Sequence, residues 1–465
     1  MKRIKYYAFA AALWLCGIAL TTSCSLEDNP VNDPVWPSTE EDEAQENRDE
    51  LIRHIENDAK TVADLFNIES LNVASQAYEQ LSALMENDKA FLTNMRAILS
   101  AVSEQKSLLS ISPVEAGSEL AKMGYLLYIT ADNSGFGVRV VFDGKGGCRL
   151  QSANHMEFIF PATIQGIGTT LFKLIIKDSD DYYLTVSDAN IQNLKRLACV
   201  NRLPRSLTMT LTGFIDNREL TLSESVISLE LPQDEHSSFV NFDDKSFQLT
   251  GKQNNYNYQT AAVESTLDFS LSMVQDDMTL GYGYTCDAAS VINCEAQMHL
   301  SQPNGFISHM SKNAFDIVDL KAVSVRILDD LTLSGTITDG AAFAQNFTTA
   351  IKNRQQVNLP DDLAATVESL NQSCRFELSC QQMTKPETMQ FCVVQKENDY
   401  TIEPALKDLR SNTLIPISQM VDVQTMDRFN KSFNMSFTPG GNATGSALKI
   451  YSAFVQMMPL INLSF

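Results

Sequence analysis

The chain has 465 residues, of which 44% are hydrophobic and 20% are charged. This is the composition of a globular protein, and it excludes wholesale disorder, a collagen-like repeat and a membrane protein with many spans. The formal charge of −22, from 35 basic and 57 acidic residues, argues against nucleic acid or an anionic lipid surface as a partner.

Residues 1–23 have the pattern of a secretory signal peptide. Three basic residues, Lys2, Arg3 and Lys5, precede an apolar run from Tyr6 to Leu20. A run of this length is too short to span a bilayer comfortably, and it is typical of a signal peptide. We therefore expect this segment to be removed on export.

The residues before Cys24 resemble a bacterial lipobox. Leu20 and Ser23 match that motif well, whereas Thr21 and Thr22 match it loosely. The resemblance implies that the thiol of Cys24 is acylated and that Cys24 becomes the first residue of the mature lipoprotein, with palmitate-type chains that anchor it in a membrane. An ordinary secretory cleavage near the same position is the alternative.

Residues 24–42 are predicted to form an acidic tether that contains proline. Between Ser25 and Glu50 there are ten acidic residues and a single base, Arg48. Such a stretch is charged and extended. Acids placed directly after the cysteine resemble the surface-export signal of Bacteroidetes-type lipoproteins. That resemblance implies a protein anchored by lipid in the cell outer membrane and facing the exterior, and it implies no activity.

Residues 43–112 are predicted to form a three-helix unit. Apolar residues recur there at helical spacing in three successive stripes. They are Leu51, Ile52, Ile55, Ala59, Val62, Leu65 and Phe66, then Leu71, Ala74, Ala77, Tyr78, Leu81 and Met85, then Phe91, Leu92, Met95, Ile98, Leu99 and Val102. We interpret the stripes as core packing.

Beyond Pro113 the apolar period changes from helical to two residues. Leu207, Met209 and Leu211 alternate with threonines, and the segments 267–273 and 278–284 alternate in the same way. This pattern predicts antiparallel sheet with one apolar face. The expected fold class is α+β and mainly β, in which the helical unit precedes a large antiparallel body, either a sandwich or a curved sheet, with a few covering helices, one of them over Asp361–Leu370. We expect two β-rich regions, 113–310 and 311–465.

Nine cysteines become seven thiols if Cys16 leaves with the signal peptide and Cys24 carries lipid, so they cannot all pair within one chain. A turn at Lys385-Pro386-Glu387 would place Cys380 opposite Cys392, and Cys286 and Cys294 end the apolar faces of two adjacent strands. These four residues are either disulfide pairs or buried core thiols. No C-x-x-C pair supports a zinc site.

Local catalytic motifs are not found, among them G-x-S-x-G, H-E-x-x-H, a P-loop and an EF-hand loop. The five histidines, including His54 in the first predicted helix, are isolated, and we interpret them as surface residues. Acidic doublets such as Asp329-Asp330 are best explained as turn residues. The sequence thus predicts no catalytic residue, metal or cofactor, and it favours a non-enzyme.

Tyr256 and Tyr258 are the best candidates for ligand recognition. Both tryptophans precede the folded body, so any stacking surface has to use tyrosine, and these two lie in a run rich in Asn and Gln. The leading hypothesis is a surface lipoprotein with a binding or envelope-structural role and an unknown ligand. The alternatives are a carrier of an apolar or lipid ligand, and a hydrolase whose site leaves no local motif.

Overall fold

The computed structural model describes residues 40–66, 68–87, 137–145, 147–153, 155–178, 182–184, 202–230, 246–300, 318–340, 342–343, 360–383, 385–396, 399–408, 411–421 and 424. The predicted signal peptide, Cys24, most of the tether, the third helical stripe and the boundaries near 112 and 310 lie outside these residues. Among the described residues, no helix has an apolar stretch long enough to cross a membrane.

The protein is mainly β, and it divides into two compact units. The first unit consists of Met1–Asn67, Asp276–Thr285 and Ala289–Phe433; the second consists of Ile68–Gln275, Cys286–Ala288 and Asn434–Phe465. The two helices described before residue 112 fall in different units. The predicted three-helix unit is therefore not confirmed.

Eight strands of the first unit follow one another in the order of the chain, β11 to β18. Their bounds are β11 Asp277–Cys286, β12 Ala289–Leu300, β13 Val318–Ile327, β14 Leu331–Ile337, β15 Cys374–Ser379, β16 Glu387–Lys396, β17 Asp399–Asp408 and β18 Thr413–Pro416. From β12 to β18 every printed pair is antiparallel. A short 3-10 helix, η8 (Ile417–Gln419), follows β18.

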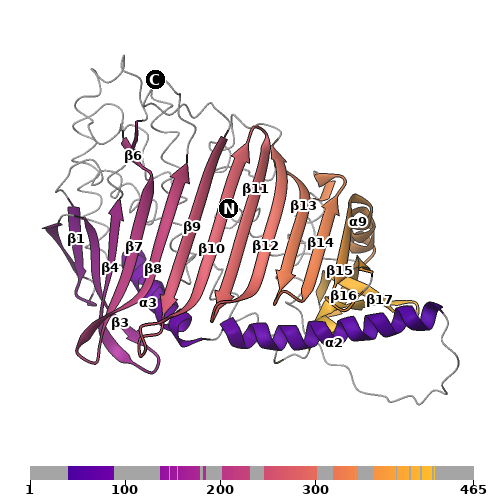
Figure 1. Ribbon diagram of the computed structural model, residues 1–465, viewed down its shortest axis with the longest axis horizontal. Coiled ribbons are helices and arrows are strands. Elements are labelled where there is room, and N and C mark those ends of the chain that lie inside the picture. Colours follow the sequence, from indigo (N-terminus) through magenta and orange to yellow (C-terminus); the bar gives the residue numbers. More distant parts are fainter. Residues whose placement is uncertain are drawn as a thin grey trace. The chain divides into compact units, whose positions relative to one another are not determined.

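Two helices belong to the first unit. Helix α2 (Glu40–Phe66) buries Leu51, Ile55, Ala59 and Val62, which recur at intervals of three and four and so share one helical face. Helix α9 (Pro360–Ser373) packs on β15, β16 and β17, which confirms the helix predicted over 361–370. Figure 1 shows α2 beside the ends of β13 and β14.

The second unit contains eight further strands in the order β10-β9-β8-β7-β4-β3-β1-β2. Their bounds are β1 Gly137–Phe142, β2 Cys148–Ala153, β3 Met156–Ile164, β4 Gly168–Asp178, β7 Ser206–Ile215, β8 Arg218–Glu230, β9 Ser246–Tyr256 and β10 Val263–Val274. The pair β1-β3 is parallel, and the other printed pairs are antiparallel. Strands β5 (Tyr182–Leu184) and β6 (Arg202–Pro204) form a separate ribbon.

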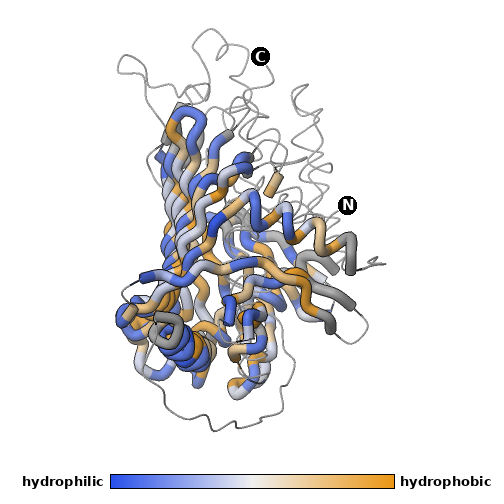
Figure 2. The backbone as a smooth tube through the Cα atoms, turned by 90° about the vertical axis from the view of Figure 1, so that its right-hand side faces the viewer, coloured by the Kyte–Doolittle hydropathy of each residue, from blue (hydrophilic) through white to orange (hydrophobic). Residues whose placement is uncertain are grey.

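The alternation predicted from the sequence is present in the strands. Leu207, Met209 and Leu211 are buried in β7, and their threonine neighbours are less buried. Hydrophilic and hydrophobic residues alternate along the strands in Figure 2. Asp216 and Asn217 both have positive φ, 49° and 60°, as a two-residue hairpin of type I′ requires, and this turn joins β7 to β8.

Helix α3 (Glu69–Asn87) covers β3, β8, β9 and β10 within the second unit. Its buried face includes Leu71, Ala74 and Tyr78. Two glutamines on α3 hydrogen-bond the backbone at the end of β3: Gln80 contacts Thr163 in the strand, and Gln76 contacts Gln165 in the turn that follows. Apolar packing and these backbone contacts together fix α3 on the sheet.

Candidate functional site

Three donor side chains from distant parts of the chain meet in the first unit. His54 comes from α2, Asp330 from the turn between β13 and β14, and Cys380 from the residue after β15. One donor atom from each lies within 4.8 Å of the other two. Among the described residues this is the one such group of three metal-ligating side chains, and we call it the His54 cluster.

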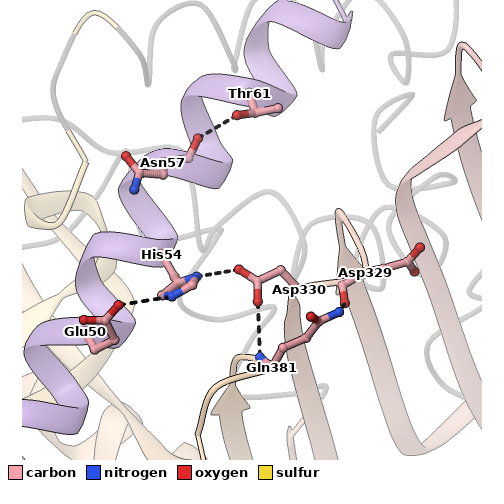
Figure 3. A network of polar contacts seen from close by, with 7 residues as sticks. All are labelled: Glu50, His54, Asn57, Thr61, Asp329, Asp330 and Gln381. Atoms are coloured by element: carbon pink, nitrogen blue, oxygen red, sulfur yellow. Dashed lines mark hydrogen bonds and ion pairs between the residues drawn. The ribbon is translucent and has the colours of Figure 1, made fainter.

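Both ring nitrogens of His54 face carboxylates. Nδ1 is 2.5 Å from Oδ2 of Asp330, and Nε2 is 3.3 Å from Oε1 of Glu50, one helical turn earlier on α2. Figure 3 shows the imidazole between these two groups. The side chain of His54 is 18% exposed, so the contacts are only partly screened by solvent. His54 therefore links α2 to the β13–β14 turn.

Asp330 is held by the backbone of two turns. Its own N–H donates to the carbonyl of Ile327 at 2.9 Å, and its Oδ1 accepts from the backbone N–H of Gln381 at 3.1 Å. The side chain of Gln381 in turn donates to the carbonyl of Asp329 at 2.7 Å. The two carboxylate oxygens of Asp330 thus make different contacts. Oδ1 connects the two turns, and Oδ2 faces His54 (Figure 3).

Asp58 lies one helical turn after His54, and its surroundings disfavour its charged form. Its Oδ2 is buried and has no hydrogen-bond partner. Burial, and after it the charge of Asp330, raise the pKa of Asp58 from 3.8 to about 6, although the charge of His54 opposes both effects. The Asp58 carboxylate is therefore disfavoured in its charged form beside this cluster.

Helix α2 has two further polar anchors within the same unit. Near its beginning, Arg48 Nη2 is 2.6 Å from Oε2 of Glu387, and both side chains are largely buried. At its end, the hydroxyl of Tyr284 donates to the carbonyl of Leu65 at 2.8 Å, which satisfies one of the carbonyls that a helix leaves open at its C-terminus. The His54 cluster lies between these anchors along the helix.

A second polar cluster lies in the second unit, where α3 covers β8, β9 and β10. Five polar residues of these strands are at most 4% exposed: Ser223, Ser225, Gln253, Asn255 and Ser265. The strand register places Ser223 opposite Asn255 and Ser225 opposite Gln253, so they share one face. Hydrogen bonds run from Gln253 to Asn255 at 2.8 Å and from Asn255 to Ser265 at 3.1 Å.

That cluster is only partly satisfied. The hydroxyl of Tyr78 on α3 is 3.3 Å from that of Ser223, and burial raises the pKa of Tyr78 to about 12. The oxygens of Ser225, Ser75 and the Gln253 amide are buried without a hydrogen-bond partner. Each costs free energy unless a bound water or ligand satisfies it.

The hydroxyls of the two tyrosines expected to recognise a ligand, Tyr256 and Tyr258, contact neighbouring carboxylates. The hydroxyl of Tyr256 donates to Glu224 at 2.6 Å, and that of Tyr258 donates to Glu69, the first residue of α3, at 2.7 Å. Burial and the Glu224 contact raise the pKa of Tyr256, and the bond to Glu69 raises that of Tyr258. Their rings are partly exposed, but their hydroxyls hold local structure together.

The expected position of Cys380 opposite Cys392 is wrong. The β15-β16 register places Leu378 opposite Glu387, so Cys380 lies beyond the paired residues toward the turn, and Cys392 lies beyond the opposite end. The turn begins earlier than predicted, at Gln381. Both cysteines are free thiols, and burial raises the pKa of Cys392 to about 12.

Cys286 and Cys294 are buried thiols. Cys286 is the last residue of β11, and Cys294 lies within β12 opposite Val325 of β13. Their environment fits the core-thiol alternative. Cys24, the predicted site of lipidation, lies outside the described residues.

Comparison with known proteins adds no further guide to the site. No protein-family model, no curated protein and no solved structure matches this chain.

The sequence did not single out His54, Asp330 and Cys380 as a group. Residues 54 and 330 are 276 positions apart, so no local spacing connects them. One signal was available: a histidine in an amphipathic helix with acids four residues before and four after it, Glu50 and Asp58, presents three ionisable groups on one helical face.

Proposed function

We propose that the protein is a lipid-anchored component of the outer membrane, held at the cell surface through Cys24, with a binding or envelope-structural role. The lipobox-like residues and the acidic tether support this address. The antiparallel strands, with helices fixed to them by polar side-chain contacts, support a rigid body that could bind a partner at its surface.

The geometry of His54 carries the non-enzymatic part of the proposal. A cysteine hydrolase needs one ring nitrogen facing the thiol and the other facing an orienting group. Here both ring nitrogens contact carboxylates, Nδ1 that of Asp330 and Nε2 that of Glu50, so no nitrogen is reserved for the Cys380 thiol. In the described part of the chain, the His54 cluster fixes α2 to two β turns. This arrangement favours a binding or structural role over hydrolysis.

The carrier alternative requires an apolar sheet face under a helix. In the second unit α3 instead covers the buried polar residues of β8, β9 and β10, three of them Ser225, Gln253 and Asn255. An apolar ligand would leave these groups without partners. The polar cluster therefore favours a polar occupant, and surface binding remains the leading proposal.

Protease treatment of intact cells tests the address. We expect the protein to disappear from the immunoblot while a periplasmic control protein survives. Survival of both until the outer membrane is broken would overturn surface display and move the body to the periplasm.

Metabolic labelling with an alkyne fatty acid tests the anchor. The Cys24→Ser variant should lose the label and leave the membrane fraction. The matched Cys16→Ser variant changes a cysteine within the predicted signal peptide and should keep the label. Equal labelling of wild type and Cys24→Ser would contradict lipidation at this position.

A further inference from the structure

We propose that His54, Asp330 and Cys380 bind a divalent transition-metal ion, with Zn²⁺ the best fit, which joins α2 to the two neighbouring β turns. The three donors come from separate elements and converge within 4.8 Å of one another. This assignment goes beyond the binding or structural role proposed above and is independent of the cell location.

The donor set selects the class of metal. An imidazole nitrogen, a thiolate sulfur and a carboxylate oxygen are the ligand types of Zn²⁺ sites, whereas Mg²⁺ and Ca²⁺ prefer oxygen alone. Binding converts the Cys380 thiol into a thiolate and releases its proton to solvent. The charge of the ion then balances the thiolate and the carboxylate of Asp330.

The outer contacts of a metal site are already in place. A histidine that ligates a metal usually donates its other ring N–H to a carboxylate, which fixes the ring. Here Nδ1 faces the cluster and Nε2 faces Glu50 at 3.3 Å. Oδ1 of Asp330 is likewise held by the backbone N–H of Gln381, which leaves Oδ2 directed inward.

The cluster needs only a small adjustment to admit an ion. Donors around a tetrahedral Zn²⁺ lie about 3.3–3.8 Å apart, given metal–ligand bonds of about 2.0–2.3 Å. Nδ1 of His54 and Oδ2 of Asp330 are now 2.5 Å apart, so a bound ion requires them to separate by about 1 Å.

Asp58 supplies an independent indication that a cation belongs here. Its Oδ2 is buried without a hydrogen-bond partner, on the same helical face as His54 and one turn further along. A buried carboxylate oxygen without a donor is costly unless a cation or a proton satisfies it. A metal ion at the cluster would place positive charge one helical turn from this carboxylate, and the fourth ligand position is open to water.

Cobalt(II) is the probe for the test, because a thiolate bound to Co²⁺ gives a charge-transfer band in the near ultraviolet. The full-length protein, purified in detergent and reduced, is titrated with Co²⁺. We expect one Co²⁺ per chain, a saturable band, and displacement of the ion by one equivalent of Zn²⁺. No saturable band at one equivalent would overturn the proposal.

Variants assign the ligands. Cys380→Ser should abolish the band, whereas the matched control Cys392→Ser, a strand cysteine of the same unit, should keep it. Glu50→Gln should keep the band but weaken affinity about tenfold or more, as the loss of an outer hydrogen bond does. An unchanged band in Cys380→Ser, or its equal loss in Cys392→Ser, would refute the assignment.

The Asp330→Asn variant keeps the test decisive if Cys380→Ser does not fold. Far-ultraviolet circular dichroism reports folding for each variant. A folded Asp330→Asn protein should bind Co²⁺ at least about tenfold more weakly and still show the thiolate band. Wild-type affinity in this variant would exclude Asp330 as a ligand and overturn the three-ligand site.

Discussion

Asp58 is a side chain whose removal should stabilise the protein. Its carboxylate lies partly buried beside Asp330, and burial together with that charge raises its pKa from 3.8 to about 6. At about 1.36 kcal/mol per pKa unit, the ionised form costs at most about 3 kcal/mol in the folded state. Because the group is partly exposed, solvent screening reduces this to about 1–2 kcal/mol.

The sign of the pH dependence follows from the direction of the shift. Below pH 3.8 the carboxyl is protonated in both folded and unfolded chains and carries no penalty. The penalty grows as the pH rises from 3.8 to about 6, and it is complete above that value. Asp58→Asn removes the charge, so its stabilising effect should be full at pH 8 and absent near pH 4.

Thermal and urea unfolding of the full-length protein, with a chelator present, measure this difference at both pH values. Asp64→Asn is the matched control, because Asp64 is an exposed acid on the same helix. It should change the free energy of unfolding far less, and with no such pH dependence. A destabilised Asp58→Asn variant at pH 8, or an equal gain at pH 4 and pH 8, would refute the reasoning.

Three further substitutions test other contacts through the free energy of unfolding in urea. Glu387→Gln leaves the guanidinium of Arg48 buried without its counter-ion, and it should cost about 3 kcal/mol. Ser225→Ala removes a buried hydroxyl that has no partner, so it should be neutral or stabilise by up to about 1 kcal/mol; a clear loss would show that water satisfies the hydroxyl. Gly335→Ala places a Cβ against the ring of its cross-strand partner Phe376, and it should cost about 1–3 kcal/mol, whereas an unchanged stability would show that the ring moves aside.

The strands were predictable because their signal is local. Alternation at 207–211 and 278–284 identifies which side chains face the core, and β7 and β11 follow that pattern. The helix over 361–370 was predictable for the same reason, since its apolar stripe is contained within the helix. Neighbouring residues suffice to predict such elements.

The grouping of the helices was not predictable in this way. The stripes of α2 and α3 show that each helix has a buried face, but an apolar stripe does not specify what covers it. The first stripe packs on strands more than 200 residues later in the chain, and the second packs on β3, β8, β9 and β10. A sequence pattern therefore predicts that adjacent amphipathic helices pack on each other, whereas α2 and α3 belong to different units.

The predicted register of β15 and β16 was wrong for a different reason. The proline at 386 suggested the centre of the turn, but proline also begins strands, and the turn actually lies near Gln381. A shift of a few residues changes every cross-strand partner. The expected pairing of Cys380 with Cys392 is therefore absent, and Cys380 belongs to the His54 cluster.

The Asp329-Asp330 doublet shows why a turn and a site need not be competing explanations. The prediction that this doublet forms a turn is confirmed. Leu328 and Asp329 have positive φ, and the backbone N–H of Asp330 donates to the carbonyl of Ile327. The same geometry places the Asp330 carboxylate between the Gln381 backbone and His54. Turn preference therefore explains why an aspartate stands at this position, and the docking of α2 determines what its carboxylate binds. Because the cluster is complete only when α2 lies in place, a metal ion bound there would also hold α2 against the strands, and loss of the ion would weaken that contact first.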